Sequence, residues 1–545
     1  MLPFSAWCGN TEADNAVPCV PTGQTDQPSS FWLTNRGVVA LCFVVLELVF
    51  FATDSVGDPA HAYVSGDVGG TPYLQHWFMV AFLVPAALIM PLLGNLRERV
   101  GSKAIATVGP GIFGLACLLS ACVTDPQLFI LLRAVQGLSA GVIPAAAGGY
   151  LGGQLGEKYT PMGKGLVALA LVTGSSLGIP LSAFVTWYFS WRLLYVGLGL
   201  SALAAVAVIA RLMPGTPGNP DAEIDWLGYA LMSGGFGLLS LSLVVGNQRE
   251  WFESPIYVVM LWSSLLLISL FAWRMATKPK LFNPRIFQDI NYCISTFILT
   301  LLLFFLFMVF AIVPRFLTIA VDNAIMNYAW VFVPFVFTTM LTGIMVSPGV
   351  SPHLIARSIA SKKNVCTSAI LAFGCTALWM ANTSSLQSNA NMTLQMMLVG
   401  ACFALINCLE IQMAFSTMAA ELMTSASSVL FFCTNIAKVL SGGVTSAIST
   451  ATSQGSWERF REQLDPSNPA LESFKQPLEG HTLGITTDTW SQGSLELIQK
   501  AISQQAEVVT FVNVSTLVGL VLLLLCGLPL LHRSPAGSAS TQHKP

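Results

Sequence analysis

The sequence predicts an all-α membrane protein with fourteen transmembrane helices. Of its 545 residues, 54% are hydrophobic and only 10% are charged, whereas soluble domains carry about 25% charged residues. The mean hydropathy of +0.67 points the same way. Apolar stretches of roughly 20 residues, long enough to cross ~30 Å of hydrocarbon, recur along nearly the whole chain. They must be helices, because lipid satisfies no backbone N–H or C=O group and the chain lacks the alternation of a barrel.

The expected spans fall into a 6+2+6 arrangement. The first six end before a turn-rich run at 214–220, two more follow, and a basic linker leads into the last six. Two spans could be miscounted, most easily the short one at 365–381. The expected bounds are 36–57, 72–93, 104–124, 128–149, 164–188, 192–213, 226–245, 255–275, 293–314, 327–349, 365–381, 393–416, 427–451 and 508–531.

This arrangement suggests two bundles that flank a central path, as in transporters built from related halves. The N-terminal six-helix bundle is expected at 36–213 and the linker with its two extra helices at 214–292. The C-terminal bundle is expected at 293–451 together with 508–531. Two polar tails, 1–35 and 532–545, and an outer loop at 452–507 complete the expected organisation.

Basic residues give the orientation. With the N-terminus inside, 16 of the 25 Lys and Arg residues fall in cytoplasmic segments. The short outer loops carry three, Arg192, Arg249 and Arg315. This asymmetry places both termini in the cytoplasm. No signal peptide is expected, because the first 35 residues contain no Lys, no Arg and no apolar h-region.

The outer segment 452–507 is the one large soluble element expected. It holds eight acidic and four basic residues, so its net charge is −4. The run 457–464 predicts a short amphipathic helix, and Leu495, Ile498 and Ile502 fall at helical spacing before the last span. Two interpretations stay open: a helical hairpin that caps the bundle, and a docking surface for an envelope partner.

Charged side chains inside the first and fourth spans are candidates for proton coupling. Glu47 and Asp54 share one helix face, and Arg133 lies within an apolar span. A cation in hydrocarbon costs at least about 2.5–3.5 kcal/mol, so it usually faces the bundle interior or a water-filled path. Asp54 and Arg133 both belong to the outer half of the membrane, and we expect them to pair. A carboxylate whose partner changes between conformations can couple a proton, whereas a static ion pair is the alternative.

A second polar set lies in the last third of the chain. Glu410 and Gln412 belong to the twelfth span and Lys438 to the thirteenth. Lys438 could neutralise Glu410, or either could meet cargo. His61 and His76 are expected in the outer loop or at the interface, as solvated histidines.

Glycines are expected to shape helix packing. Gly174 and Gly178 form a G-x-x-x-G pair that allows close helix approach, and Pro180 should bend that helix. The expected neighbour is the small-residue run 145–149. Packing is the main interpretation, but a packed face can also slide when bundles rock.

Catalytic and metal-binding motifs are not found. The chain has twelve cysteines but no CxxC pair, which argues against a disulfide framework or a zinc site. It has no HExxH motif and no nucleophile elbow, so an enzyme is not expected.

Several motifs, taken in their order along the chain, resemble those of the major facilitator superfamily, and in particular of its fourteen-span drug:proton antiporter family 2, the EmrB-like exporters. Residues 94–103 resemble the family's loop between spans 2 and 3, and 133–137 its span 4 signature. Residues 174–192 resemble the antiporter motif of span 5, and Asp54 falls where span 1 carries its aspartate. The run 225–228 and the run 281–287 also favour fourteen spans over twelve.

The resemblance implies a proton-driven exporter of amphipathic small molecules in a bacterial inner membrane, working by alternating access. Asp54, with Glu47, would bind the proton and Arg133 would sense its charge. No cofactor is implied beyond the proton gradient. A periplasmic membrane-fusion adaptor could bind through 453–505. The gate loop that would hold the outward-open state comprises Gly94, Glu98, Arg99, Gly101 and Lys103.

Departures from the family pattern at 178–183 and 314–318 favour a narrower cargo. The alternatives are therefore a narrow-specificity exporter of an endogenous metabolite or siderophore-like compound, or an importer on the same fold. Fold alone does not decide the direction of transport.

Overall fold

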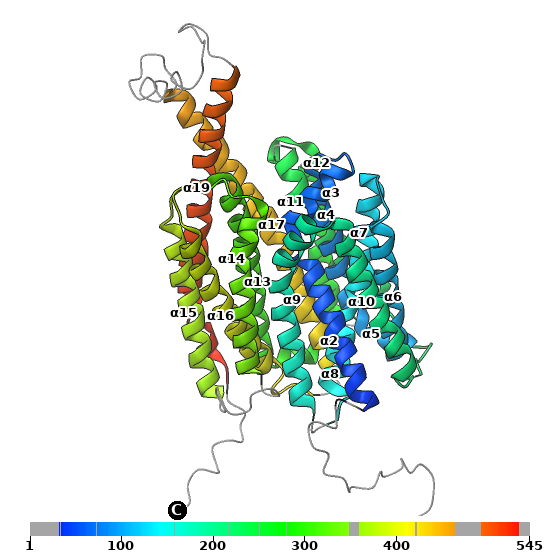
Figure 1. Ribbon diagram of the computed structural model, residues 1–545. Coiled ribbons are helices and arrows are strands. Elements are labelled where there is room, and N and C mark those ends of the chain that lie inside the picture. The colour runs from blue at the N-terminus through cyan, green and yellow to red at the C-terminus, as the bar shows by residue number, and fades with distance from the viewer. Residues whose placement is uncertain are drawn as a thin grey trace, which may run out of the picture.

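The computed structural model describes Trp32 and residues 34–533, apart from 72, 157–158, 216, 250, 279–280, 348–358, 420–421 and 464–491. Within these ranges, fourteen helices are long and apolar enough to cross a membrane. The expected all-α fold is confirmed, including the short eleventh span. In Figure 1, α2 begins and α19 ends at the lower end of the molecule, which is the cytoplasmic end by the distribution of basic residues.

The N-terminal bundle contains six spans, and two of them are built from more than one helical piece. A short helix, α3 (Gly57–Asp67), follows the first span on the outer side. The spans are α2 (Asn35–Asp54), α4 (Tyr73–Ile89) continued by η1 (Met90–Leu92) and α5 (Leu93–Val100), α6 (Ser102–Ser120), α7 (Pro126–Ala140) continued by α8 (Val142–Gly153), α9 (Thr160–Tyr188) and α10 (Trp191–Leu212).

The central pair is α11 (Trp226–Gln248) and α12 (Pro255–Thr277), with the short turn η2 (Trp251–Glu253) between them. The C-terminal bundle follows the turn η3 (Pro284–Gln288) and ends in the turn η6 (Leu528–Leu531). Its spans are α13 (Ile290–Arg315) continued by the π-helical turn η4 (Phe316–Ala320), α14 (Ile325–Val346), α15 (Ile359–Ala381), α16 (Asn389–Ala414), α17 (Met423–Gln463) and α19 (Gln492–Leu525).

Several spans begin at a short polar side chain that caps the helix N-terminus. Asp125 accepts hydrogen bonds from the backbone N–H groups of Gln127 and Leu128 at 2.8 and 2.9 Å, at the start of α7. Asp225 accepts from Gly228 N at 3.0 Å at the start of α11. These oxygens satisfy donors that the first helical turn leaves free, so they fix where each span begins.

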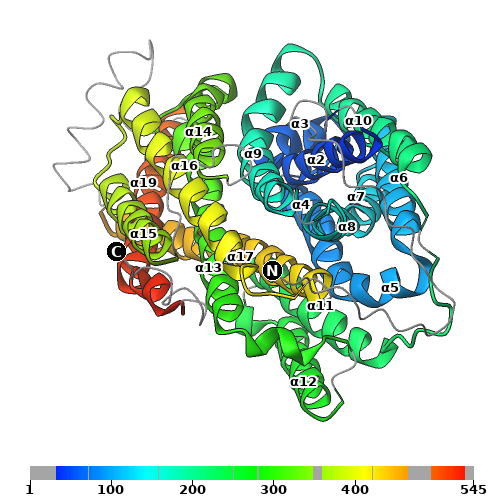
Figure 2. The same cartoon turned by 90° about the horizontal axis from the view of Figure 1, so that it is seen from below.

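Figure 2 shows the two bundles side by side, with α11 and α12 set against one flank. α11 packs against α4 of one bundle and α17 of the other. α12 is the most peripheral span, and Val259, Trp262 and Trp273 on it are all more than 60% exposed. Large apolar side chains exposed in this way fit a helix that faces lipid.

α17 and α19 extend beyond the other helices on the outer side, where they form a projecting pair (Figure 1). α17 has 41 residues, about 60 Å of helix, which is roughly twice the hydrocarbon thickness. The amphipathic run expected from residue 457 continues α17 to Gln463, and Leu495 to Ile502 lie on α19. The described part of this segment projects away from the bundle and does not cap it; residues 464–491, and the greater part of both tails, lie outside the described residues.

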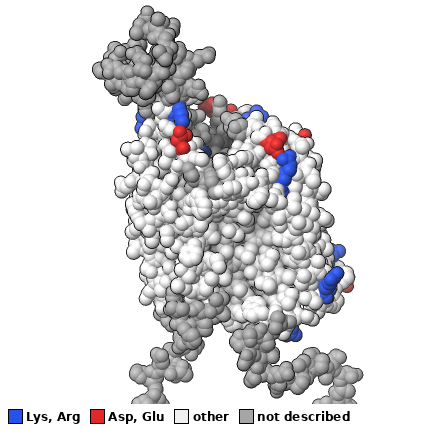
Figure 3. Space-filling view, viewed as in Figure 1, with Lys and Arg blue, Asp and Glu red and all other residues white. Residues whose placement is uncertain are grey.

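Charged side chains on the face in Figure 3 gather at the two ends of the molecule, and uncharged residues form the band between them. This is the pattern of a protein whose middle contacts hydrocarbon and whose ends contact water and headgroups.

The close approach at Gly174 and Gly178 joins α9 to α2, and not to the small-residue run 145–149 as expected. A Cβ on Gly174 would lie 2.7 Å from Phe51 Cβ, and one on Gly178 would lie 2.5 Å from Ala52 O. Pro180 is buried inside α9, which continues as one helix to Tyr188. The run 145–149 belongs to α8, which packs against α17 and, nearer the start of α9, against α9 at Gly163. The two glycines therefore position the outer end of α2, where Asp54 lies.

The expected gate loop is mostly helical. Gly94, Glu98 and Arg99 lie on α5, which packs against α17 of the other bundle. The chain breaks only at Gly101, whose φ of +86° is a conformation that glycine adopts without strain. Lys103 already lies in the first turn of α6. This segment therefore links the two bundles at the cytoplasmic end.

His61 is buried, contrary to the expectation of a solvated side chain. It lies on α3, is 2% exposed, and its ring stacks edge-on against Phe78 at 5.8 Å. α3 is held over the bundle because Asp67 at its end accepts a hydrogen bond from Trp191 Nε1 at 3.0 Å and forms an ion pair with Arg192. The segment after the first span is thus a packed outer helix. It is not a free loop.

Candidate functional site: a cavity between the two bundles

A cavity of about 440 Å³ separates the two bundles in the outer half of the molecule. Its size is that of a site for a small organic molecule. Met79, Leu83, Phe307 and Phe310 give it an apolar wall. The polar lining comes from helix ends on the outer side and includes Gln75, His76, Gln248, Arg315, Ser453 and Gln454. Because its polar lining lies at the outer helix ends, the cavity belongs to the outer side.

The cytoplasmic half of the path is closed. Lys164 Nζ of the N-terminal bundle donates to Phe415 O of the C-terminal bundle at 3.2 Å. A Cβ on Gly148 would lie 3.4 Å from Ser427 Oγ, so α8 and α17 touch at this level. The space left between the bundles here is about 20 Å³, room for a single water molecule. The structure is therefore an outward-open conformation.

Asp54 and Lys438 form a buried ion pair at the base of the cavity. Asp54 is the last residue of α2, and Lys438 lies on α17. Lys438 Nζ donates to Asp54 Oδ2, and the two residues are 0% and 4% exposed. Asp54 also lines the cavity, and its Oδ1 atom has no hydrogen-bond partner among the described residues. The pair is therefore both a bridge between the bundles and the charged end of the cavity.

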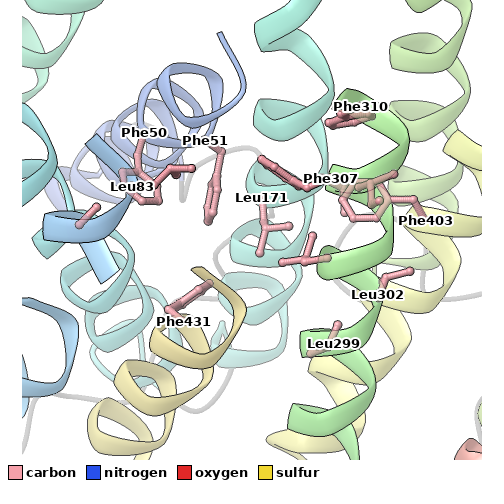
Figure 4. Packing of buried hydrophobic residues seen from close by; sticks show 14 of the residues in the cluster. Phe50, Phe51, Leu83, Leu171, Leu299, Leu302, Phe307, Phe310, Phe403 and Phe431 are labelled. Carbon is pink, nitrogen blue, oxygen red and sulfur yellow. The ribbon is translucent and has the colours of Figure 1, made fainter. Parts of the chain in front are cut away.

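Two aromatic rings and an amide complete the surroundings of Lys438. Nζ lies 5.4 Å from the ring centroid of Phe51 and 5.0 Å from that of Phe307. Asn435 Oδ1 accepts a hydrogen bond from Nζ at 3.3 Å. Figure 4 shows Phe51 on α2 and Phe307 on α13, on facing sides of the space between the bundles. These contacts hold the ammonium at the boundary of the two halves.

Arg133 does not pair with Asp54, and this corrects the expected arrangement. Its Nε atom donates to Phe78 O at 3.1 Å, and Nη1 donates to Gln136 Oε1 at 2.9 Å. The guanidinium also lies 4.5 Å above the ring of Phe82. These partners all belong to the N-terminal bundle, so Arg133 is satisfied there while Lys438 occupies the carboxylate of Asp54. Arg133 is 1% exposed, and its charge still acts near Asp54 across the bundle interior.

Glu47 is fully buried, and neither carboxylate oxygen has a partner among the described residues. An ionised carboxylate in this position would lack the compensation that a buried charge needs. The neutral, protonated form of Glu47 therefore fits this conformation. Asp54 and Glu47 lie on one helix, but only Asp54 reaches the cavity.

Glu410 pairs with a histidine instead of Lys438. Ser295 Oγ donates to Glu410 Oε2 at 2.8 Å, Cys366 Sγ donates to Oε1 at 3.1 Å, and His532 Nε2 lies 3.3 Å from Oε2. Gln412 accepts from Lys362 Nζ at 2.9 Å. The expected set of Glu410, Gln412 and Lys438 thus divides. Glu410 and Gln412 lie in the cytoplasmic part of the C-terminal bundle, and Lys438 lies at the cavity.

The outer rim carries a third charged pair. Arg315 Nη2 lies 3.1 Å from Glu507 Oε2, which joins the end of α13 to α19. Arg315 lines the cavity, as does His76 at the start of α4. Both groups therefore lie at the outer end of the cavity.

Sequence patterns did not reveal two of these residues in their structural roles. Lys438 was visible as an intramembrane cation, but its partner lies 384 positions away in the chain, and one sequence offers no signal for that contact. His532 follows the last span directly and reads as part of a polar tail. Within the described ranges, no group of three or more His, Cys, Asp or Glu residues is arranged to hold a metal ion.

The sequence also matches known proteins. A family model described as Major Facilitator Superfamily matches residues 43–442. The fatty acid resistance protein FarB of Neisseria gonorrhoeae is 23% identical over 83% of this chain and 90% of its own length. The multidrug export protein EmrB of Escherichia coli is 21% identical over 89% of this chain and 93% of its own.

A solved structure supports the fold alone. A bacterial homologue of the human lysosomal transporter Spinster, crystallised in an inward-facing and occupied conformation, superposes with a TM-score of 0.52 at 12% identity. The alignment covers 92% of this chain and 99% of that one.

Proposed function

The chain belongs to the major facilitator superfamily, and on this premise we propose that it exports amphipathic small molecules in exchange for protons, by alternating access. The chain is a multi-pass membrane transporter and not an enzyme. The finer proposal concerns its energy source, its cargo and its direction. It needs no cofactor, since the proton gradient supplies the energy.

The Asp54–Lys438 pair carries the proposal. It is buried and joins the two bundles, and Asp54 lines the cavity at the same time. A proton that enters from the outer side reaches the pair through the cavity. Gain or loss of that proton changes the charge that holds the bundles together, and a change in an interfacial charge can bias one conformation over another. Glu47 lies on the same face of α2 as Asp54, nearer the cytoplasmic end, and it is the second group that we assign to proton coupling. Arg133 supplies the fixed charge nearby.

An amphipathic cargo fits the lining. The cavity has an apolar wall of Met, Leu and Phe side chains and a polar edge of Gln, Ser and Thr side chains, a division that suits a molecule with an apolar body and a polar end. The names of the relatives, a fatty acid resistance protein and multidrug export proteins, agree with cargo of this kind. A narrower exporter, or an importer on the same fold, is the second candidate.

We further propose that the protein lies in a bacterial inner membrane and that the projecting helices α17 and α19 bind a periplasmic adaptor protein through 453–505. Their length beyond the bundle supports this role. The test is co-purification of an adaptor from membranes. Loss of the adaptor after deletion of 453–505 is the expected result, whereas retention of the adaptor, or isolation of a transporter without one, contradicts it.

The test of the transport proposal is proton movement in energised proteoliposomes on addition of amphipathic compounds. The wild type should show cargo-dependent proton flux, and Asp54→Asn, reconstituted at the same amount of folded protein, should abolish it. Asp67→Asn, which alters an aspartate on the outer surface, is the matched control and should retain the flux. Flux that persists in Asp54→Asn would exclude Asp54 from the mechanism, and cargo moving in the same direction as the proton would indicate an importer.

A further inference from the structure

The permanent charge that the cavity leaves open to a ligand is positive. Among the described residues that line the cavity, Asp54 and Arg315 are the only Asp, Glu, Lys or Arg residues. The side chain of Asp54 is 0% exposed and pairs with Lys438, whereas the side chain of Arg315 is 36% exposed. His76 also lines the cavity, and an imidazole is either neutral or positive. A charged ligand in the cavity therefore meets the guanidinium of Arg315.

The guanidinium of Arg315 has hydrogen-bonding capacity to spare. Its Nη2 atom donates to Glu507 Oε2 at 3.1 Å, and within the described ranges Nε and Nη1 have no hydrogen-bond or ion-pair partner. A guanidinium carries five N–H donors in a planar fork. That fork matches the two oxygens of a carboxylate, which it can bind through two parallel hydrogen bonds. Arg315 can therefore bind a ligand carboxylate while it keeps its contact with Glu507.

A purely structural role for Arg315 would be to link α13 to α19 through Glu507. The next residue, Phe316, already makes this link, because its ring stacks on that of Phe511 in α19 with the centroids 4.3 Å apart. Both rings are fully buried, and stacked buried rings stabilise a helix contact by packing. A partly exposed ion pair adds little to such a contact. Packing of α13 on α19 therefore does not require a charge at position 315.

An apolar wall leads from Arg315 toward the middle of the membrane. Phe307, Phe310 and Pro314 precede Arg315 on α13 and line the cavity with it. The helix rises about 12 Å from Phe307 to Arg315. Leu83 of α4 lies on the facing side of the cavity (Figure 4). The cavity is thus apolar at depth and positive at its outer end, which suits a ligand with an apolar body and a negative end.

Building on the proposed function, we infer that Arg315 determines the specificity of the cavity and that the cargo is an amphipathic organic anion. Its carboxylate binds the guanidinium of Arg315, and its apolar body lies along α13 toward Phe307. Glu507 then shares the guanidinium with the ligand. Two carboxylates on one guanidinium repel each other, so Glu507 weakens binding of the anion in this outward-open conformation.

The test compares ligands that share an alkyl chain and differ in the charge of the head group. Radiolabelled decanoate is the probe, and its binding to the purified full-length chain in lipid nanodiscs is measured by scintillation proximity, with empty nanodiscs subtracted. Unlabelled decanoate, decanamide and decyltrimethylammonium are the competitors, at a pH where decanoate is ionised. Decanoate should compete at least about tenfold better than the other two, because hydrogen bonds to a charged group are the stronger ones.

Substitutions at the two partners separate ligand binding from structure. Arg315→Gln should weaken decanoate binding by about tenfold or more and remove the preference over decanamide. Glu507→Gln should tighten decanoate binding, because the competing carboxylate is gone. A pair with only a structural role would instead make both variants bind more weakly. Arg192→Gln is the matched control, since Arg192 also pairs with one carboxylate on the outer side, has a side chain that is 37% exposed, and does not line the cavity; it should bind decanoate as the wild type does.

Four outcomes overturn the inference. They are absence of decanoate binding, equal competition by the three head groups, an unchanged preference in Arg315→Gln, and a parallel loss of affinity in Arg315→Gln and Glu507→Gln. Better competition by decyltrimethylammonium would assign the cavity to cations, which also contradicts it.

Failure of this inference is distinguishable from failure of the proposed function, because the binding assay needs no membrane gradient. Selective decanoate binding that depends on Arg315, without proton flux in energised proteoliposomes, would support the inference and contradict proton-coupled transport. Proton flux driven by decyltrimethylammonium and not by decanoate would do the reverse.

Discussion

Asp54 and Lys438 are 384 positions apart in the chain, yet they form a buried ion pair that joins α2 of one bundle to α17 of the other. The pair lies where the outer cavity ends and the closed cytoplasmic interface begins. Below it, Lys164 and the backbone of Phe415 join the bundles. A change of charge at this level acts on both halves at once, which is what alternating access requires of a coupling site.

Removal of either partner should destabilise the protein, and removal of both should cost less. Asp54→Asn or Lys438→Gln leaves one buried charge unpaired, a loss of about 3–5 kcal/mol in the free energy of unfolding. The double variant has no charge to compensate, so its loss should be smaller than the sum of the two. Unfolding of the purified proteins in detergent measures the three values. Additive losses would show that the pair contributes nothing as a pair.

Close packing of α9 on α2 should tolerate no side chain at Gly178. A Cβ there would lie 2.2 Å from Ser55 Oγ and 2.5 Å from Ala52 O, so Gly178→Ala must move α2 at the residues next to Asp54. We expect a loss of about 1–3 kcal/mol in stability together with reduced proton-coupled transport.

Gly197→Ala is the matched control for that substitution. Gly197 also lies inside a span, α10, but nothing lies within 4 Å of a Cβ placed on it. Alanine should stabilise this helix by about 0.5–1 kcal/mol. Melting temperatures in detergent compare the two variants, and equal effects at both positions would mean that contact with α2 is not what limits Gly178.

The fold could be predicted from the sequence because it depends on local patterns. Each span is a run of apolar residues of membrane length, and its boundaries follow from polar caps such as Asp125 and Asp225. The projecting helices were also foreseeable in part, because Leu495 and Ile502 continue the helical period of the last span. These signals are all local, because each lies within a single span or at its ends.

The site could be predicted only as a set of residues. Asp54, Arg133, Glu410 and Lys438 were recognisable because each is a charge in hydrocarbon, but their partners depend on how distant helices pack. Depth alone suggested Asp54 with Arg133, and the structure instead pairs Asp54 with Lys438 because Phe78 and Gln136 already satisfy the guanidinium. Burial of His61 was missed for the same reason: its segment looks polar but packs as α3.

Substitutions of Arg133 can separate the contribution of its hydrogen bonds from the contribution of its charge. Arg133→Lys keeps a cation but cannot donate to Phe78 O and Gln136 Oε1 in the same geometry. It should lower stability by about 1–3 kcal/mol and leave proton coupling in place. Arg133→Gln removes the charge near Asp54 and should shift the pH at which cargo-driven proton flux is half-maximal. Detergent unfolding and flux assays across pH provide the two readouts, and an unshifted profile in Arg133→Gln would assign Arg133 to structure alone.

His532 should make the stability of the C-terminal bundle depend on pH. Burial by itself would lower the pKa of His532, but the hydrogen bond and the negative charge of Glu410 raise the pKa above its ordinary value. The folded protein therefore holds this proton more tightly than the unfolded chain. The resulting stabilisation is complete below the ordinary histidine pKa of about 6.5, and it is lost as the pH rises through the higher pKa of the folded state.

Thermal unfolding in detergent from about pH 5.5 to pH 8.5 tests this linkage. The wild type should lose stability across the upper part of that range, and His532→Gln should show a flatter profile because position 532 no longer titrates. His76→Gln, at a histidine that lines the outer cavity, is the control and should retain the wild-type slope. Glu410 and His532 have further partners: Ser295 and Cys366 donate to Glu410, and Lys363 donates to the backbone oxygen of His532. Around the imidazole ring, Ser295 Oγ lies 2.9 Å from Nε2 and Pro529 O lies 2.8 Å from Nδ1. A wild-type profile that matches His532→Gln would mean that the Glu410–His532 contact holds the end of the last span without exchanging a proton.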